Sequence, residues 1–520
     1  MTAWHLVLDG SEVPSREAVG NKARGIALMR SRGLPVPPAF VIPTHVGRRF
    51  VEAGGVLPDE AWSGALAGIR ALEAETGRCF GGAEAPLLVS VRSGAAQSMP
   101  GMMDTILNLG IGDEVEAALA RESGDPAFAR DTHRRFLEAY ARTVLKARVA
   151  VDDASTPAGV RAAALAVAGT PVPADPYEQL RGAIGAVFAS WESPRAKAYR
   201  KHWEISALGG TAVTVQAMVY GNLDERSGTG VLFTRNPHSG EPEPYGEFLP
   251  RGQGEDVVSG EVQPLDLEHL RALLPEVHAA LLAAGDVLER DAAEVQDVEF
   301  TVERGRLYLL QTRNAKRSPE AALRFAVDLA NEGLTAPADA VGAVRAEHIA
   351  SVLRPVIDPA RRAEATLLAR GEPACPGVGS GLAVGDADEA ERLDREGRPA
   401  VLVRRSTSPE DVHGMIASNG VCTEVGGRTS HAAVVSRELG RPCVVGCGEG
   451  ALLSLIGRVV TIDGATGEVF DGELPTRHLE VHEHPHLAQL VVWAEEHREA
   501  IGDDHPLLEI AALRPQEGAR

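Results

Sequence analysis

Apolar residues recur along the chain with two different periods. They keep helical spacing in EAALRFAVDLANEG (320–333) and LAQLVVWAEEHREAI (487–501), and PARRAEATLLARG (359–371) is predicted as a further helix. Strand-like runs, RPAVLVRR (398–405) and GRVVTIDG (457–464), alternate with helical segments. The pattern after residue 371 therefore predicts a compact β/α domain.

The stretch QDVEFTVERGRLYLLQTRN (296–314) alternates as a β-hairpin does. A three-residue loop, Glu303 to Gly305 with Gly305 left-handed, would pair Val302 with Arg306, Glu299 with Leu309 and Asp297 with Gln311. One face would then be apolar (Val298, Phe300, Val302, Tyr308 and Leu310) and the other polar (Asp297, Glu299, Gln311 and Arg313). Two carboxylates, an amide and a guanidinium on one surface suit Mg²⁺ and a triphosphate, although a solvated hairpin face has the same pattern.

Proline and glycine divide the chain. GEPACPGVGSGLAVG (371–385) is typical of the entry to a new domain. We expect a first domain over 1–320 with a helical insert near 112–205, a helical linker over 321–371, a second domain over 372–473, and a C-terminal helix and tail over 474–520. The linkers around 353–378 and 473–485 are candidate hinges.

Charge and composition narrow the function. The 520 residues carry a net charge of −21, which argues against nucleic acid or an anionic membrane surface as the partner. The N-terminus lacks the features of a signal peptide, and no stretch approaches the roughly 18 apolar residues of a membrane span. The five cysteines lack zinc-ligand spacing. We expect reduced thiols and a cytoplasmic protein.

One histidine has a distinctive setting. In GGRTSHAAVVSREL (426–439), the glycines allow a tight turn, and Thr429 or Ser430 can cap the helix that follows. His431 then lies in the first helical turn, where free N–H groups and the helix dipole favour an anion. An imidazole there could carry a phosphoryl group, or the histidine could belong to a capping turn without chemistry.

Other segments resemble phosphate-binding loops. Lys22 lies in a glycine-flanked turn before an amphipathic helix in AVGNKARGIALMRSRGLPVPPAFVIPT (18–44). In LLVSVRSGAAQSMPGMMDTILNLGI (87–111), Arg92 ends a strand that enters a Gly/Ser/Met loop. Such loops bring backbone donors close to phosphate oxygens, although most lysines and arginines beside glycine are merely solvated.

These motifs together resemble pyruvate phosphate dikinase, a family of phosphoenolpyruvate-utilising enzymes. The resemblance is longest in VLVRRSTSPEDVHGMIASNGVCTEVGGRTSHAAVVSRELGRPCVVGC (401–447), where Val425 and Arg428 depart from the usual residues. It extends through SMPGMMDT (98–105), DTHRRFLEAYART (131–143) and 211–260 to cover roughly residues 1–500. The fold it implies is a multidomain α/β and α+β protein, with an ATP-grasp nucleotide-binding domain followed by a swivelling β/β/α phosphohistidine domain.

The resemblance also implies roles for single residues. His431 would be the phosphoryl carrier, and Thr429 matches a threonine that a regulatory kinase modifies in some members. Asp297, Glu299 and Gln311 would hold Mg²⁺, and SGTG (Ser227, Gly228, Thr229 and Gly230) would be a mobile loop that closes over phosphates. The residues implied in binding ATP and phosphate are Lys22, Arg92, Arg135, Glu247, Asp297, Glu299, Gln311 and Arg313.

The family's C-terminal barrel, which binds pyruvate or phosphoenolpyruvate, needs about 250 residues that we do not find here. ATP and orthophosphate are therefore the expected substrates, with pyruvate bound to a barrel protein in trans. Two alternatives remain open: a different small-molecule or protein acceptor, and a truncated regulator that binds nucleotide without turnover. A homodimer is also open. HLEVHEHPH (478–486) could bind a metal, but its composition is more typical of a solvated linker.

Overall fold

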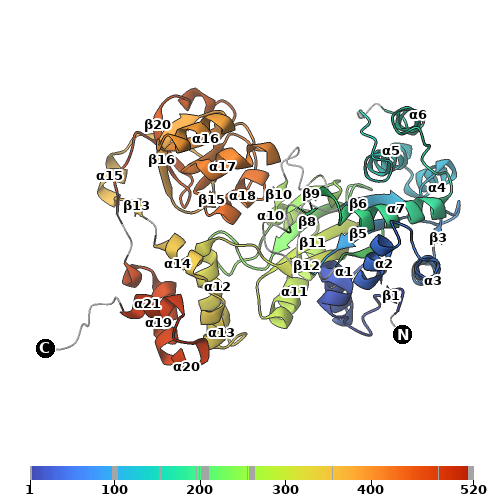
Figure 1. Ribbon diagram of the computed structural model, residues 1–520, viewed down its shortest axis with the longest axis horizontal. Helices are drawn as coiled ribbons and strands as arrows, with labels where there is room; N and C mark the ends of the chain where they lie inside the picture. The colour runs from blue at the N-terminus through green and yellow to red at the C-terminus, as the bar shows by residue number, and fades with distance from the viewer. Residues whose placement is uncertain are drawn as a thin grey trace.

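The computed structural model describes residues 3–96, 104–150, 155–194, 196–197, 200, 210–254, 256, 264–353, 355–477 and 480–512. Figure 1 shows a larger part formed by the N-terminal half and a second domain, coloured orange, formed by residues 367–471. A layer of helices lies beneath this second domain, which is called the orange domain below. No helix in these ranges is both long and apolar enough to cross a membrane.

The first sheet of the N-terminal half has the strand order β1-β2-β7-β5-β6. Its neighbouring strands are antiparallel. Buried residues of α2 to α7 share a hydrophobic core with this sheet. The strands are β1 (Leu6–Val7), β2 (Ala39–Ile42), β5 (Val89–Gly94), β6 (Thr105–Leu109) and β7 (Ala212–Ala217), and a small separate ladder joins β3 (Cys79–Phe80) to β4 (Pro86–Leu87). The helices are α1 (Arg16–Ser31), α2 (Thr44–Glu52), α3 (Asp59–Thr76), α4 (Asp113–Ser123), α5 (Pro126–Thr143), α6 (Pro157–Ala168) and α7 (Pro176–Ser190). Helices α4 to α7 occupy most of the range expected for the helical insert.

The second sheet has the order β10-β9-β8-β11-β12. One face packs on α10 and α11 and on the buried side of α1, so that α1 contributes to the core between the two sheets. The elements are β8 (Gly228–Phe233), β9 (Tyr245–Pro250), β10 (Leu265–Asp266), α10 (Leu267–Leu273), α11 (Pro275–Ala292), β11 (Gln296–Glu303) and β12 (Arg306–Asn314).

The helical linker and the C-terminal helices form one unit, although the orange domain separates them in sequence. Leu323 and Val327 of α12 share a core with Leu487 and Leu490 of α19. The helices are α12 (Pro319–Asn331), α13 (Pro337–Gly342), α14 (Ala346–Val352), α19 (Pro485–Glu496), α20 (Arg498–Ile501) and α21 (Pro506–Ala512). The chain therefore leaves this unit, forms the orange domain and returns to it.

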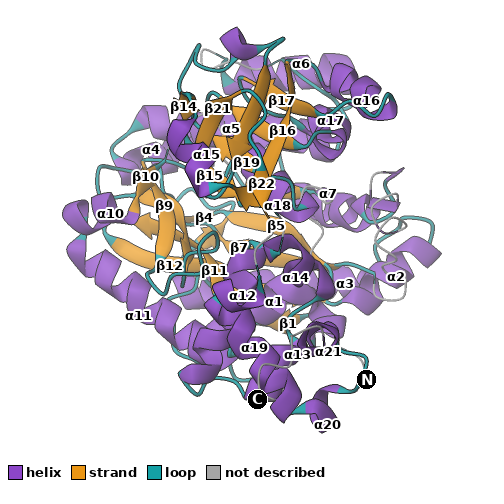
Figure 2. Ribbon diagram, turned by 90° about the vertical axis from the view of Figure 1, so that its left-hand side faces the viewer, coloured by secondary structure: helices purple, strands orange, loops and turns teal. Residues whose placement is uncertain are grey.

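The orange domain is built on a sheet of order β14-β21-β20-β16-β17-β18-β19-β15, with a core on each face. Its strands are β14 (Leu367–Arg370), β15 (Glu372–Cys375), β16 (Val378–Val384), β17 (Ala400–Arg404), β18 (Gly420–Thr423), β19 (Cys443–Val445), β20 (Val459–Asp463) and β21 (Glu468–Asp471). Its helices are α16 (Ala387–Arg395), α17 (Val412–Ala417) and α18 (His431–Leu439), with 3₁₀ turns at Pro409–Asp411 and Leu453–Leu455. In Figures 1 and 2, α18 lies on the side of the domain that faces the second sheet.

The segments that enter and leave the orange domain pair with each other. Strand β13 (Val356–Ile357) is antiparallel to β22 (Thr476–Arg477), and a short helix, α15 (Pro359–Glu364), follows β13. A 3₁₀ turn at Val481–Glu483 then leads into α19. The candidate hinges thus lie side by side.

The helix predicted over 359–371 is wrong beyond Glu364. Ala365 has extended backbone angles, and Leu367–Arg370 form β14, which pairs with β21. The sheet of the orange domain therefore begins at Leu367 rather than at 372. Ladder hydrogen bonds to β21 satisfy the backbone groups that a longer helix would have paired internally.

Candidate functional site

The β11–β12 hairpin carries the predicted polar face, but its predicted register is wrong. Arg304 and Gly305 form a two-residue turn, both with positive φ (51° and 76°), and Val302 pairs with Leu307. The neighbouring loop stabilises this turn: Gly305 N–H donates to the carbonyl of Arg226 (2.8 Å), and Arg304 N–H donates to the hydroxyl of Ser227 (3.0 Å).

A bulge then restores the polar face. Phe300 pairs with Leu309, whereas Glu299 pairs with Gln311, so that Leu310 is the extra residue. Leu309 N–H donates to the carbonyl of Pro35 (2.7 Å), outside the hairpin. Leu307 and Leu309, and not Tyr308 and Leu310, consequently join the buried core. The four polar residues share one face through the pairs Asp297–Arg313 and Glu299–Gln311.

Two buried oxygens on this face have no hydrogen-bond donor in the described part of the chain: Oδ1 of Asp297 and Oε1 of Gln311. Oδ2 of Asp297 accepts from Nε of Arg313 at 2.7 Å, so the guanidinium satisfies only one of its oxygens. Unpaired buried oxygens are costly unless something else binds them. Together with the carboxylate of Glu299, they offer the hard oxygen ligands that Mg²⁺ prefers. The residues therefore fit the ion that the sequence implies.

Cations from three elements surround the carboxylates. Gly20, with φ 77°, breaks α1 against the end of β5, where a Cβ would clash with the backbone of Gly94, and Lys22 starts the helical run that follows. Arg92 of β5 donates to Glu299 at 3.3 Å. The side chains of Glu299 and Arg313 keep 33% and 38% of their surfaces exposed, so the cluster is open to a ligand.

The electrostatics of this cluster favour a polyanion. Burial, reinforced by Arg92 and Arg313, lowers the pKa of Lys22 to about 7, although Glu299 acts in the opposite direction. Burial raises the pKa of Asp297 despite Arg313. Burial also works against ionisation of Glu299, but Arg92, Arg313 and Lys22 outweigh it and hold that pKa below its usual value. A triphosphate would relieve the repulsion among these three cations.

Glu247 and Arg135 lie outside the cluster of Lys22, Arg92 and the hairpin carboxylates. Glu247 on β9 pairs with Val231, which pairs with Glu299, so that Glu247 and Glu299 share a face with one strand between them. Arg135 on α5 is held by two carboxylates, Asp131 (2.8 Å) and Asp256 (2.9 Å). The described contacts do not bring Arg135 to the hairpin.

The predicted mobile loop Ser227, Gly228, Thr229 and Gly230 is wrong as local structure, because Gly228–Phe233 form the central strand β8. A Cβ on Gly228 would lie 2.2 Å from the ring of Phe248, and one on Gly230 would lie 2.6 Å from the ring of Phe300. These glycines make room for aromatic rings in the core. Most of the Gly/Ser/Met loop, residues 97–103, lies outside the described residues.

A pocket lined by residues near the start of β5 and the end of β11 was not predicted from the sequence. Leu88 lies four residues before Arg92 on the β5 side, and Met218 lies four residues after Thr214, the partner of Arg92 on β7. Because side chains alternate between the two faces of a sheet, Leu88 and Met218 lie on the same face as Arg92. Glu303, which follows Glu299 and Thr301 on one face of β11, accepts from the backbone N–H of Tyr220 at 2.7 Å. The lining residues are Arg78, Pro86, Leu87, Leu88, Leu119, Glu122, Ser123, Met218, Tyr220, Leu223, Glu303 and Arg304.

His431 is the first residue of α18, which confirms the predicted position in the first helical turn. Ser430 is the N-cap residue, but its side chain makes no capping hydrogen bond, and its hydroxyl is buried without a partner in the described chain. Nδ1 of His431 lies 3.1 Å from the hydroxyl of Thr407. Burial lowers the pKa of His431, and Asp411 opposes this effect. The ring is therefore neutral at neutral pH.

The loop before His431 contacts the second sheet. The hydroxyl of Thr429 donates to the Glu247 carboxylate, whose pKa burial raises. Arg437 of α18 donates to Nδ1 of His238 at 3.2 Å and to the carbonyl of Arg428 at 2.9 Å. The sheet that carries the carboxylate cluster thus also contacts the histidine loop, at strand β9, which β8 separates from β11.

Two models of known protein families match parts of the chain. Residues 64–270 match the family model described as pyruvate phosphate dikinase, AMP/ATP-binding domain. Residues 397–467 match the model described as PEP-utilising enzyme, mobile domain.

Curated relatives match over most of the chain. The chain is 43% identical to pyruvate, phosphate dikinase of Rhizobium meliloti (strain 1021) over 507 residues, which cover 88% of this chain and 56% of that protein. It is 42% identical to chloroplastic pyruvate, phosphate dikinase 1 of Zea mays (88% and 52%) and 38% identical to the enzyme of Clostridium symbiosum (96% and 61%). The chain thus spans little more than half the length of these relatives. By both family models and these identities, the chain is a relative of the pyruvate, phosphate dikinases over most of its length.

Proposed function

We propose that this protein transfers the β-phosphoryl group of ATP to His431 while orthophosphate takes the γ-phosphoryl group, so that AMP and pyrophosphate leave. The observation that carries the proposal is the contact between Thr429 and Glu247. It holds the loop that precedes His431, the first residue of α18, against the sheet that also carries the carboxylate cluster.

The nucleotide would lie along β5, between the pocket and the carboxylate cluster. The pocket beside Leu88 and Met218 suits the base, because it is partly apolar and has polar groups at Tyr220 and Glu303. Leu88 and Arg92 are four residues apart, about 13 Å along an extended strand. That span lets the triphosphate reach Lys22, Arg92 and Arg313.

Asp297, Glu299 and Gln311 would hold Mg²⁺ through the oxygens that otherwise lack donors. When bound, the ion neutralises phosphate charge and helps to align the reacting groups. Lys22, Arg92 and Arg313 bind the phosphate oxygens and stabilise the charge that moves during transfer.

Thr407 would select the nitrogen of His431 that reacts. With the ring proton on Nδ1 and donated to the hydroxyl of Thr407, the lone pair of Nε2 is free to attack phosphorus. Among the described residues, Nε2 has no hydrogen-bond partner, and the ring is at the positive end of α18. A new N–P bond forms there as the bond between phosphorus and the departing AMP oxygen breaks.

The phosphoryl group would then pass to pyruvate bound on a barrel supplied in trans. The described residues contain no (β/α)₈ barrel, so the second half-reaction needs an acceptor site outside them. Movement of the orange domain about the paired strands β13 and β22 would carry His431 from one site to the other.

The test uses ATP labelled at either the β- or the γ-position, with and without orthophosphate. We expect acid-labile protein label from the β-position only, dependent on orthophosphate and absent from His431→Ala. Label that persists on His431→Ala would identify another carrier. The same chain should make phosphoenolpyruvate from pyruvate only after a barrel protein is added, and production without it would refute the proposed need for a partner.

A further inference from the structure

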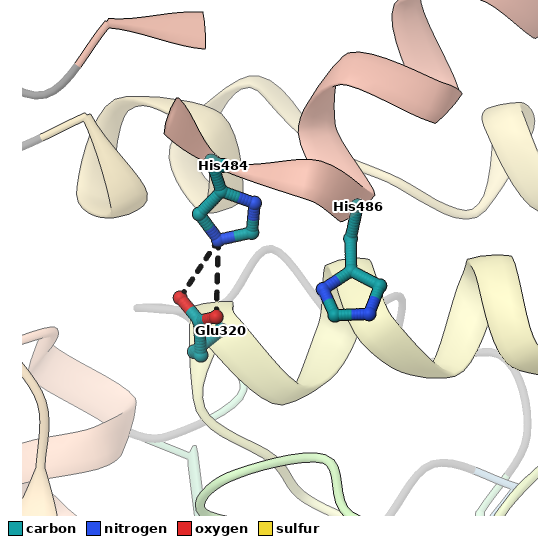
Figure 3. A group of neighbouring side chains, drawn as sticks. All are labelled: Glu320, His484 and His486. Atoms are coloured by element: carbon teal, nitrogen blue, oxygen red, sulfur yellow. Dashed lines mark hydrogen bonds and ion pairs between the residues drawn. The ribbon is translucent and has the colours of Figure 1, made fainter. Parts of the chain in front are cut away.

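Two histidines and a glutamate meet where the C-terminal helices pack on the linker. Glu320 lies in the first turn of α12, His484 caps the N-terminus of α19, and His486 lies in the first turn of α19 (Figure 3). Nε2 of His484 lies 3.0 Å from each carboxylate oxygen of Glu320. One donor atom from each of the three residues lies within 4.8 Å of the other two.

The three side chains differ in burial, because Glu320 and His486 are partly exposed and His484 is buried. His484 is only 6% exposed. Nδ1 of His486 is buried and has no hydrogen-bond partner among the described residues, and Figure 3 shows a ring nitrogen of His486 turned toward Glu320. A buried nitrogen without a partner is unfavourable unless a ligand occupies the space in front of it.

We propose that Glu320, His484 and His486 bind a divalent transition-metal ion, with Zn²⁺ as the best match. Two imidazole nitrogens and a carboxylate are a ligand set typical of zinc, and water would complete the coordination. Mg²⁺ and Ca²⁺ are disfavoured because they prefer oxygen ligands. This site is separate from the proposed phosphoryl-transfer site and does not depend on it.

Binding would exchange one hydrogen bond for a metal bond. Nδ1 of His484 accepts from the backbone N–H of Leu487 at 3.1 Å, so in the metal-free protein the ring proton is on Nε2 and is donated to Glu320. A metal at Nε2 moves that proton to Nδ1 and removes the helix cap. Losing a cap lowers the affinity only about fivefold, which a zinc site can tolerate.

The position of the site suggests its role. Glu320 follows directly after the sheet of β8–β12, whereas His484 follows the return from the orange domain, 164 residues later. A metal bond between them would fasten α19 to α12 beneath the paired strands β13 and β22. The ion would fix the base from which the orange domain moves, without touching either face of that domain's sheet.

Two other clusters of histidine and acidic residues are weaker candidates. In the group Asp113, Glu116 and His133, Asp113 is already paired with Arg161 at 2.6 Å. The group Asp388, Glu391 and His413 lies on the outer surface of α16 and α17 and has no deeply buried member. It supplies a matched control, because His413 also contacts a carboxylate, at 3.0 Å.

The experiment measures Zn²⁺ affinity of the metal-stripped, full-length chain by competition with a chromophoric chelator. We expect Glu320→Gln and His486→Ala each to weaken binding by more than about tenfold, and His413→Ala to leave it unchanged. Asp297→Asn, which alters the proposed Mg²⁺ site, should also leave it unchanged. Equal affinity in the wild type, Glu320→Gln and His486→Ala would overturn the proposal, as would loss of the tight site in Asp297→Asn.

Thermal unfolding provides a second readout that does not depend on activity. Zn²⁺ should raise the Tm of the wild type and of His413→Ala, because the ion binds the folded protein, but not that of Glu320→Gln. Far-UV circular dichroism before metal addition shows whether each variant is folded. A Zn²⁺-induced rise in Tm that is the same in folded Glu320→Gln as in the wild type would also refute the site.

Discussion

The hydroxyl of Thr407 lies 3.1 Å from Nδ1 of His431, at the first residue of α18. Thr407 comes from the loop after β17, whereas the histidine comes from the loop after β18, and these two strands are parallel neighbours. Parallel strands bring the residues that follow them to the same edge of a sheet. The pairing therefore orients the imidazole through Nδ1, and Nε2 has no hydrogen-bond partner among the described residues.

Thr407→Val should slow phosphorylation of His431 about tenfold, because the loss of one hydrogen bond removes about 1.4 kcal/mol of positioning energy. Thr407→Ser keeps the hydroxyl and should retain most of the rate. The measurement is single-turnover transfer of label from β-labelled ATP, followed over a range of pH. If Thr407→Val reacts as fast as the wild type with an unchanged pH profile, Thr407 has no positioning role.

Asp297→Asn should reduce label transfer by more than about a hundredfold and leave the protein folded, because the change keeps the shape of a side chain on a polar face. The amide loses the charge that Mg²⁺ needs and leaves Arg313 without its anion. Titration with Mg²⁺ at fixed ATP measures the effect. A normal rate with an unchanged Mg²⁺ requirement would exclude Asp297 as a ligand.

Sequence patterns located the polar face of the hairpin but not its pairing. Alternation places Asp297 with Glu299 and Gln311 with Arg313, but whether the two strands present these residues on one face depends on the turn and the bulge. The two-residue turn and the bulge at Leu310 depend on hydrogen bonds to Arg226 and Pro35, which are distant in sequence.

Residues that meet only in three dimensions were missed for the same reason. Gly228 and Gly230 belong to a glycine-rich stretch that is typical of a loop. The rings of Phe248 and Phe300, which occupy the space that side chains at these positions would fill, explain why a strand has glycine there. HLEVHEHPH has the composition of a linker. Nothing near His484 in the sequence indicates that Glu320 completes the cluster.

Proton uptake on ATP binding should reveal the state of Lys22. Its pKa of about 7 in the free protein means that most Lys22 side chains are neutral at pH 8.5. A bound triphosphate would raise this pKa toward its usual value near 10.4, so that the protein takes up close to one proton at pH 8.5 and little at pH 6.

Calorimetry in buffers of different ionisation enthalpy measures this uptake. The extra proton should disappear in Lys22→Met, which should also bind ATP more weakly. Equal uptake by Lys22→Met and the wild type at pH 8.5 would assign the proton to a different group.

Docking of the orange domain should fail when Thr429 gains a negative charge. In the structure its hydroxyl donates to Glu247, which is only 8% exposed and whose pKa burial raises. Thr429→Glu places a second carboxylate against the first, and two like charges in a poorly hydrated contact repel each other. ATP binding should persist, because neither residue is in the cluster of Lys22 and Arg92, whereas label transfer to His431 should fall by more than about tenfold.

Thr429→Ser is the matched control and should keep the contact. The double variant Thr429→Glu with Glu247→Gln should recover part of the rate, since the neutral amide can donate a hydrogen bond from its N–H to the new carboxylate. If Thr429→Glu transfers label normally, the contact does not hold the histidine loop during the reaction.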